Sequence, residues 1–176
     1  SLLGCLLLVL AFALGMGIDD PRVATLEVQQ GVSAHFLVAV GALVFAALVH
    51  AVGLTYFMGT SRWIYETGNS YPLPPGAREE SRRLKYRLMP AMAVCLLLLI
   101  LTGAAGAAAD PASPYGARGW WGLPSSTLHF ALAATTVCVN LLVNYLEYTA
   151  IFENGRIVDK VLQEVRRIRL EKGLPV

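Results

Sequence analysis

Four long apolar segments, separated by shorter polar stretches, constrain the fold of this chain more than any other feature. The segments are Leu2–Ile18, Ser33–Thr60, Leu88–Ala109 and Ser126–Phe152. A helix needs about 20 predominantly apolar residues to cross a hydrocarbon core of about 30 Å. Only helices can satisfy the backbone of such segments in lipid, because an unpaired peptide group there costs several kcal/mol. The sequence therefore predicts an all-α integral membrane protein, an up-down-up-down four-helix bundle over residues 1–152.

The composition agrees with a membrane environment. Hydrophobic residues make up 56% of the chain and charged residues only 15%. A soluble domain of 176 residues with this composition would expose large apolar patches to water. Lipid is therefore the expected solvent around the four segments.

The distribution of Lys and Arg predicts the orientation. All 14 lie outside the apolar segments, and twelve of them fall in residues 61–87 and 153–176. With four crossings these two stretches lie on one side, which the positive-inside rule makes cytoplasmic together with both termini. Trp63, Trp120 and Trp121 flank the segments where interfacial aromatic residues are expected. We predict a multi-pass protein of a bacterial inner membrane.

The motifs of soluble enzymes are missing. Cys5, Cys95 and Cys138 all lie in apolar segments, and none belongs to a Cys-x-x-Cys or Cys/His spacing. The chain also has no glycine-rich phosphate loop and no Gly-x-Ser-x-Gly sequence. Its basic residues are interleaved with glutamates, which argues against nucleic acid as a partner. We expect a subunit without catalytic chemistry, in contact with lipids and other membrane subunits.

Two of the segments carry a distinctive face. At 100° per residue, five polar side chains of the fourth segment fall within an arc of about 80°. They are His129, Thr136, Asn140, Asn144 and Glu147. One side of the second segment carries two histidines among small residues: His35, Ala39, Ala42, Ala46, His50 and Gly53. Small residues let helices approach closely and polar ones bond across the contact, so we predict that these faces meet or enclose a ligand.

His35 and His129 form a predicted outer pair, since each lies a few residues after its helix begins on the same side of the membrane. Two imidazoles at one depth are what axial ligation of a b-type haem requires. The small residues Gly103–Ala109 lie on the same side and could leave room for a macrocycle. The alternatives are that each histidine bonds a backbone carbonyl or interfacial water, or that one histidine holds the magnesium of a chlorophyll-type pigment.

In helix number and in these two histidines, the arrangement resembles the small membrane-anchor cytochrome b subunits of succinate dehydrogenase-like enzymes. The resemblance implies one haem b between His35 and His129 and contact with quinone.

His50, Asn144 and Glu147 form a predicted inner cluster, about 22 Å below the outer pair at 1.5 Å per residue. Glu147 is the only charged residue within the four segments. It is expected either to pair with an Arg of residues 61–87 or of the tail as an anchor, or to lie deeper and share a proton with His50. The second arrangement could relay protons or bind a quinone carbonyl.

Turn residues and periodicity predict the structure of the polar stretches. Residues 61–87 are expected to be irregular around Pro72, Pro74 and Pro75 and helical again from Glu79. A break at Asn154-Gly155 is expected to start a separate amphipathic tail, residues 153–176. Its apolar positions are Ile157, Val161, Val165 and Ile168. This face is expected to cover either the headgroup boundary, with Arg166, Arg167 and Arg169 on anionic lipid, or a partner subunit.

Three functions remain open from the sequence. The leading hypothesis is an accessory or assembly subunit of a larger respiratory or photosynthetic membrane complex, with a lipid or pigment contact. The second is an electron-transfer subunit with one bis-histidine haem b. The third is a small transporter or proton channel that uses His50 and Glu147.

Overall fold

The chain folds into four α-helices in a computed structural model that describes residues 2–73, 76–113, 119 and 122–175. The helices are α1 (Leu2–Met16), α2 (Leu26–Ser70), α3 (Ala77–Ala109) and α4 (Ser125–Glu171). These described parts contain no β-strand element, so the predicted all-α class is confirmed. Trp120 and Trp121, expected at a membrane interface, lie outside the described residues.

Three of the helices, α2, α3 and α4, are long and apolar enough to cross a membrane. The structure therefore supports a membrane protein. The fourth crossing remains a prediction, because α1 has 15 residues and reaches only about 22 Å at 1.5 Å per residue. It ends at Met16, two residues before the expected end.

The helices are much longer than their apolar segments. With 45 and 47 residues, α2 and α4 reach about 70 Å at 1.5 Å per residue, more than twice the hydrocarbon thickness. α2 continues past the expected end of the second span at Thr60 to Ser70. The irregular stretch expected around the prolines follows it, since Tyr71, Pro72 and Leu73 lie outside any helix. The expected helical return before the third span is confirmed, since α3 begins at Ala77.

Two glycines with positive φ mark helix boundaries in this polar part. Gly76, at φ 98°, precedes α3, and its carbonyl accepts the first helical bond, from Glu80 N at 2.8 Å. Gly173, at φ 63°, ends α4 in a Schellman-like turn in which Leu174 N bonds Arg169 O at 2.8 Å. A residue with a Cβ rarely adopts these conformations, so the glycines help to set where α3 begins and where α4 ends.

The chain divides into two compact units, which are described separately. Unit 1 comprises Ser1–His50 and Ala93–Val143, and unit 2 comprises Ala51–Met92 and Asn144–Val176.

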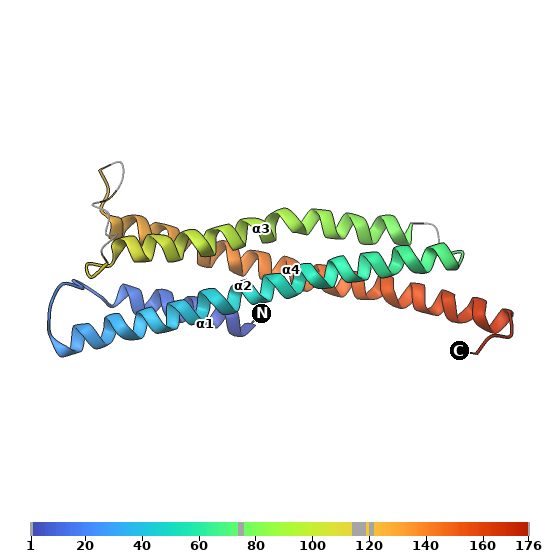
Figure 1. Cartoon of the computed structure of the whole chain (residues 1–176), viewed down its shortest axis with the longest axis horizontal. Helices are drawn as coiled ribbons and strands as arrows, with labels where there is room; N and C mark the ends of the chain where they lie inside the picture. Colours follow the sequence, from blue (N-terminus) through green and yellow to red (C-terminus); the bar gives the residue numbers. More distant parts are fainter. Residues whose placement is uncertain (1, 74–75, 114–118, 120–121, 176) are drawn as a thin grey trace. The chain divides into compact units, whose positions relative to one another are not determined.

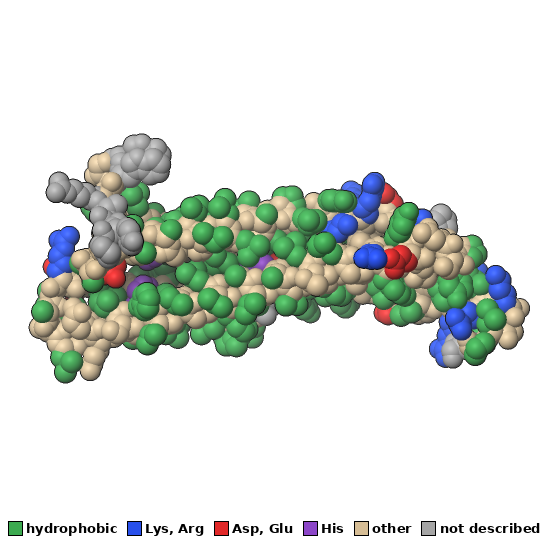
Figure 2. All heavy atoms as spheres, viewed as in Figure 1, with side chains coloured by type: hydrophobic (Ala, Val, Ile, Leu, Met, Phe, Trp, Pro, Cys, Tyr) green, Lys and Arg blue, Asp and Glu red, His purple; other side chains and the backbone are tan. Residues whose placement is uncertain are grey.

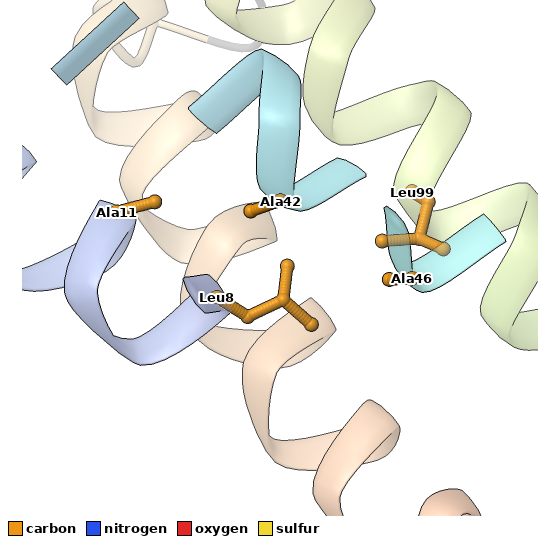
Figure 3. Close-up of a cluster of buried hydrophobic side chains, with 5 residues drawn as sticks. All are labelled: Leu8, Ala11, Ala42, Ala46 and Leu99. Atoms are coloured by element: carbon orange, nitrogen blue, oxygen red, sulfur yellow. The ribbon is translucent and has the colours of Figure 1, made fainter. Parts of the chain in front are cut away.

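In unit 1, α1 lies alongside the first part of α2 (Figure 1). The core contains Leu8, Ala11, Ala42, Ala46 and Leu99, contributed by α1, α2 and α3 (Figure 3). Ala42 and Ala46 are 0% and 3% exposed, so this part of the predicted small-residue face is buried. Alanine at these positions allows α1 and α3 to approach the α2 backbone closely.

In unit 2, segments of α2, α3 and α4 share a second core. It contains Ile64, Leu84, Ile157 and Val161, with Val165 packed against it. The apolar face of the predicted tail therefore packs against α2 and α3 of its own chain. These residues were expected to face either the lipid headgroups or a partner subunit, and both expectations are wrong for them.

The predicted break at Asn154-Gly155 is also wrong, because α4 continues through it. Asn154 is fully buried, and its amide nitrogen donates to Thr60 Oγ1 at 2.9 Å and to Tyr56 OH at 3.2 Å. Its side-chain oxygen accepts a hydrogen bond from Ser81 Oγ at 3.1 Å. These bonds to α2 and α3 offset the low helix propensity of Asn and Gly, about 1 kcal/mol per Gly.

Candidate functional site

The structure places His35 of α2 and His129 of α4 next to each other in unit 1. Their ring centroids are 6.3 Å apart, and the ring planes lie at 72° to each other. Both side chains are half-buried. On the face shown in Figure 2, histidine side chains lie at the edges of a hollow between α2 and α3. The predicted proximity of the outer pair is therefore observed, whereas the role of the pair as ligands remains a prediction.

The ring of His35 is fixed by α1. Its Nδ1 lies 2.9 Å from the carbonyl oxygen of Ala11. A carbonyl oxygen can only accept, so Nδ1–H is the donor and, in the neutral ring, Nε2 keeps its lone pair. A Cβ at Gly15, one turn further along α1, would lie 2.9 Å from Cε1 of this ring. Glycine at this position is what allows α1 to approach the imidazole so closely.

The ring of His129 is held differently. Its buried Nδ1 has no hydrogen-bond partner within the ordinary distance and angle limits, but the ring lies within hydrogen-bonding reach of the Thr102 backbone. A Cβ at Gly106 of α3 would lie 3.1 Å from Cε1 of this ring. The two histidines therefore have matched glycine neighbours but unequal hydrogen bonding.

The donor set fits haem better than a simple metal ion. Iron joined to one nitrogen of each ring by bonds of about 2 Å would hold the centroids roughly 6 Å apart, since each ring adds about 1 Å. Among the described residues, no group of three or more His, Cys, Asp or Glu could hold a metal ion. In a haem the porphyrin would supply four nitrogen ligands to the iron, so two protein imidazoles would complete the coordination of the iron.

Some of the predicted room for a macrocycle is used for packing. A Cβ at Gly103 would lie 3.3 Å from the Leu43 side chain, and Gly106 contacts His129. These contacts, with the His35–Ala11 hydrogen bond, match the alternative in which small residues permit close packing and a histidine bonds a carbonyl. That bond is compatible with ligation, because it leaves Nε2 available.

A buried polar column lies next to the pair in unit 1. Thr102 Oγ1 and Thr136 Oγ1 are 2.7 Å apart, and Asn140 donates from Nδ2 to the Thr136 carbonyl at 3.0 Å. His50 Nε2 lies 2.9 Å from Asn140 Oδ1, so Nε2–H donates to the amide oxygen. His50, Thr136 and Asn140 are at most 1% exposed. The column links α2, α3 and α4 in the apolar interior.

All three residues of the predicted inner cluster, His50, Asn144 and Glu147, are buried. His50 hydrogen-bonds Asn140, one turn before Asn144. Asn144 and Glu147 belong to unit 2 and are 8% and 3% exposed. A Cβ at Gly53 would lie 3.8 Å from the Glu147 carboxyl group. Glu147 is therefore a buried acid next to Gly53 rather than an exposed interfacial group, and its proposed exchange of a proton with His50 remains a prediction.

The predicted lipid or partner contacts of unit 2 engage the chain itself. Arg167 hydrogen-bonds Glu164, with Nε to Oε2 at 3.1 Å, and this bond lowers the pKa of the Glu164 carboxyl group. Arg169 Nη1 donates to Tyr71 OH at 3.1 Å. Trp63 is half-buried and packs against the unit 2 core. Arg166, by contrast, has an exposed side chain.

The hydrogen-bonding cluster around Asn154 was missed by the sequence reasoning, although a signal for it exists. At 100° per residue, Asn154 falls within the same arc as Thr136, Asn140 and Glu147. Continuing the polar stripe past Phe152 would have predicted an inward-facing Asn and hence an unbroken helix.

No family model, curated protein or solved structure matches the chain.

Proposed function

We propose that the protein is a membrane-embedded electron-transfer subunit that holds one b-type haem between His35 and His129. The observation that carries the proposal is the 6.3 Å separation of the two imidazole centroids, which suits a shared iron. The hydrogen bond from His35 Nδ1 to Ala11 O supports it, because a metal-binding histidine usually donates its other ring N–H to a carbonyl or carboxylate.

The chain's residues have distinct roles in this proposal. The iron supplies one-electron chemistry when haem is bound. The Ala11 carbonyl fixes the tautomer of His35 and raises the basicity of its Nε2. Gly15 and Gly106 let the backbones of α1 and α3 close over the rings. The apolar core around Ala42 and Leu99 excludes water.

The basic residues support an orientation for the chain. All twelve Lys and Arg of residues 61–87 and 153–176 belong to unit 2, whereas unit 1 contains only Arg22 and Arg118. On the face shown in Figure 2, these cations gather over the start of α3 and the end of α4. By the positive-inside rule, unit 2 carries the cytoplasmic ends of the spans in a bacterial inner membrane. The electron partner is then another membrane or surface subunit.

A difference spectrum tests the proposal. The chain purified in mild detergent is expected to show the α and Soret bands of a low-spin b-type haem in its reduced-minus-oxidised spectrum. His35→Ala and His129→Ala should each remove or shift these bands. His50→Gln is the matched control, since His50 lies in the same unit but hydrogen-bonds Asn140. An absent haem band, or bands that tolerate both alanine variants, would refute the assignment.

The second candidate is an accessory or assembly subunit of a respiratory or photosynthetic complex without a cofactor of its own. The close contacts of Gly103 and Gly106 favour it, because they use small residues for packing. In that case both alanine variants would lower stability without any spectral change, and the chain would co-purify with partner subunits. Transport through His50 and Glu147 is the third hypothesis, and loss of ion flux in Glu147→Gln would support it.

A further inference from the structure

We propose that one exposed face of α3 in unit 2 binds the phosphate headgroup of an anionic phospholipid. The face consists of Arg82, Arg83, Tyr86 and Arg87 and is called the α3 basic face below. The inference does not depend on the proposed haem. It uses only the basic part of α3 and the length and apolar character that let this helix cross a membrane.

The α3 basic face is the side of the helix that the unit 2 core leaves open. At 100° per residue its four residues fall on one side of α3, and all four side chains are exposed. On the other side of the helix, Ser81, Leu84 and Leu88 are buried. Together with Glu79, the four exposed side chains line an open hollow of about 600 Å³. Figure 2 shows Lys and Arg side chains at the surface over the start of α3.

The face has more cationic groups than nearby carboxylates can pair. Arg82 pairs with Glu79 at 3.0 Å. Arg87 Nη2 lies 3.7 Å from Glu153 Oε2, which is longer than an ordinary hydrogen bond. Among the residues that the structure describes, Arg83 takes part in no ion pair. A guanidinium group can bind a phosphate through two parallel hydrogen bonds, so Arg83 and Arg87 suit a phosphodiester.

The position of the face along α3 matches the headgroup layer of a bilayer. The apolar part of the helix, Leu88–Ala109, is about 33 Å long at 1.5 Å per residue, close to the hydrocarbon thickness of about 30 Å. Arg87 and Arg83 precede Leu88 by about 1.5 Å and 7.5 Å along the helix. The headgroup layer adds about 5–8 Å on each side of the hydrocarbon, so both guanidinium groups lie at the level of lipid phosphates. Tyr86, which is 60% exposed, is an aromatic residue of the kind enriched at this interface.

The basic residues of the α4 end fit this layer less well. Arg166 lies about 21 Å along α4 from Phe152, the last residue of the fourth apolar segment. Arg167 pairs with Glu164, and Arg169 donates to a tyrosine hydroxyl. The anionic lipid contact that the sequence suggested for the tail is therefore expected at the α3 basic face.

Binding of two lipids that differ only in headgroup charge tests the inference. The full chain in mild detergent would be titrated with dioleoyl phosphatidylglycerol or dioleoyl phosphatidylcholine, and bound lipid would be counted by native mass spectrometry. The wild-type chain is expected to bind phosphatidylglycerol at least 10-fold more tightly. One basic residue near an anionic headgroup contributes about five-fold in affinity, so the double variant Arg83→Gln, Arg87→Gln should bind phosphatidylglycerol about 25-fold more weakly. Arg166→Gln, Lys172→Gln is the matched control, because it removes the same charge from two exposed residues of the tail.

Each outcome bears on the inference directly. Loss of the preference in the α3 variant, with less than a two-fold change in the control, supports the α3 basic face as the lipid site. Equal losses in the two variants would overturn it, because net charge and not this face would then govern binding. Equal binding of the two lipids by the wild-type chain would also overturn it, without need of any variant, and would leave the face to an acidic protein surface. Haem content is a separate measurement, so either proposal can fail while the other stands.

Discussion

Replacing Gly15 by alanine tests the contact between α1 and His35 without requiring any cofactor. The added Cβ would lie 2.9 Å from Cε1 and 3.2 Å from Nδ1 of the imidazole. Interiors are close-packed, so the ring or α1 has to move by about 0.5 Å to restore ordinary contact. That movement lengthens or breaks the 2.9 Å hydrogen bond from Nδ1 to the Ala11 carbonyl.

The expected change in stability is the sum of three effects. Overpacking a closed site costs about 1–3 kcal/mol. Loss of a neutral hydrogen bond costs about 0.5–1.5 kcal/mol. Alanine restores about 1 kcal/mol of helix propensity relative to glycine. Gly15→Ala is therefore expected to lower the free energy of unfolding by about 0.5–3.5 kcal/mol.

Gly41→Ala is the matched control, because a Cβ at Gly41 in α2 meets nothing within 4 Å. This control should be neutral or stabilising by up to about 1 kcal/mol. Both variants would be unfolded by denaturant in the same detergent and followed by tryptophan fluorescence and circular dichroism. If Gly15→Ala were as stable as Gly41→Ala, the close approach of α1 to His35 would be refuted.

Three further predictions concern unit 2. Asn154→Ala removes the buried partner of Ser81 and of the Tyr56 and Thr60 hydroxyls of α2. It should lower the free energy of unfolding by at least about 1–3 kcal/mol, measured by denaturant. An unchanged denaturation midpoint would contradict the hydrogen-bonding cluster. Ile157→Ala should lower the free energy of unfolding by about 2–5 kcal/mol and increase hydrogen exchange at the end of α4, because Ile157 lies in the unit 2 core. Leu162, by contrast, is 49% exposed, so Leu162→Ala should have little effect. Equal effects of the two substitutions would contradict packing of α4 against the chain's own core. The Arg167 hydrogen bond lowers the pKa of Glu164, so the pair stabilises the folded state above the pKa of Glu164 in the unfolded chain, and this stabilisation is lost as the pH falls through the pKa in the folded protein. Amide hydrogen exchange at this turn should therefore rise in acid in the wild type, and Glu164→Gln should remove that rise. A rise in Glu164→Gln equal to that of wild type would argue against the pair.

The outer pair was predictable because its signals are local. The helical periodicity placed His35 and His129 on inward faces. Both lie only a few residues after the start of their apolar segments, so an error in the depth estimated from the number of residues is small. For the inner cluster, the structure shows a bond from His50 to Asn140, one turn before Asn144. The contact of His50 with Asn144 and Glu147 stays a prediction, because it depends on the relative depth of two helices, which one sequence does not determine.

The polar extensions of the helices could not be predicted from apolar segments alone. Residues 61–70 look like a loop after a membrane exit, yet they remain helical because Ile64 packs against Leu84 and Ile157. Tertiary packing of an amphipathic face often outweighs intrinsic propensity in this way. The α4 periodicity was recognised correctly, but part of its covering surface comes from Ile64 of α2, which lies beyond the expected end of the second apolar segment.

The redox potential of the proposed haem offers a last test that uses the helix geometry. Ala39 lies one turn after His35 on the same face of α2 and is half-buried. A carboxylate there would stabilise the extra positive charge of the oxidised form. If the charges were about 8 Å apart at an effective dielectric constant of about 20, the gain would be about 2 kcal/mol. For a one-electron couple this corresponds to a potential lowered by about 90 mV. Ala39→Glu should therefore have a lower potential than Ala39→Gln, which has nearly the same shape without the charge, in a titration followed at the α band at pH 8. Equal potentials in the two variants would mean that the iron does not lie beside this turn of α2, and the bis-histidine assignment would have to be abandoned.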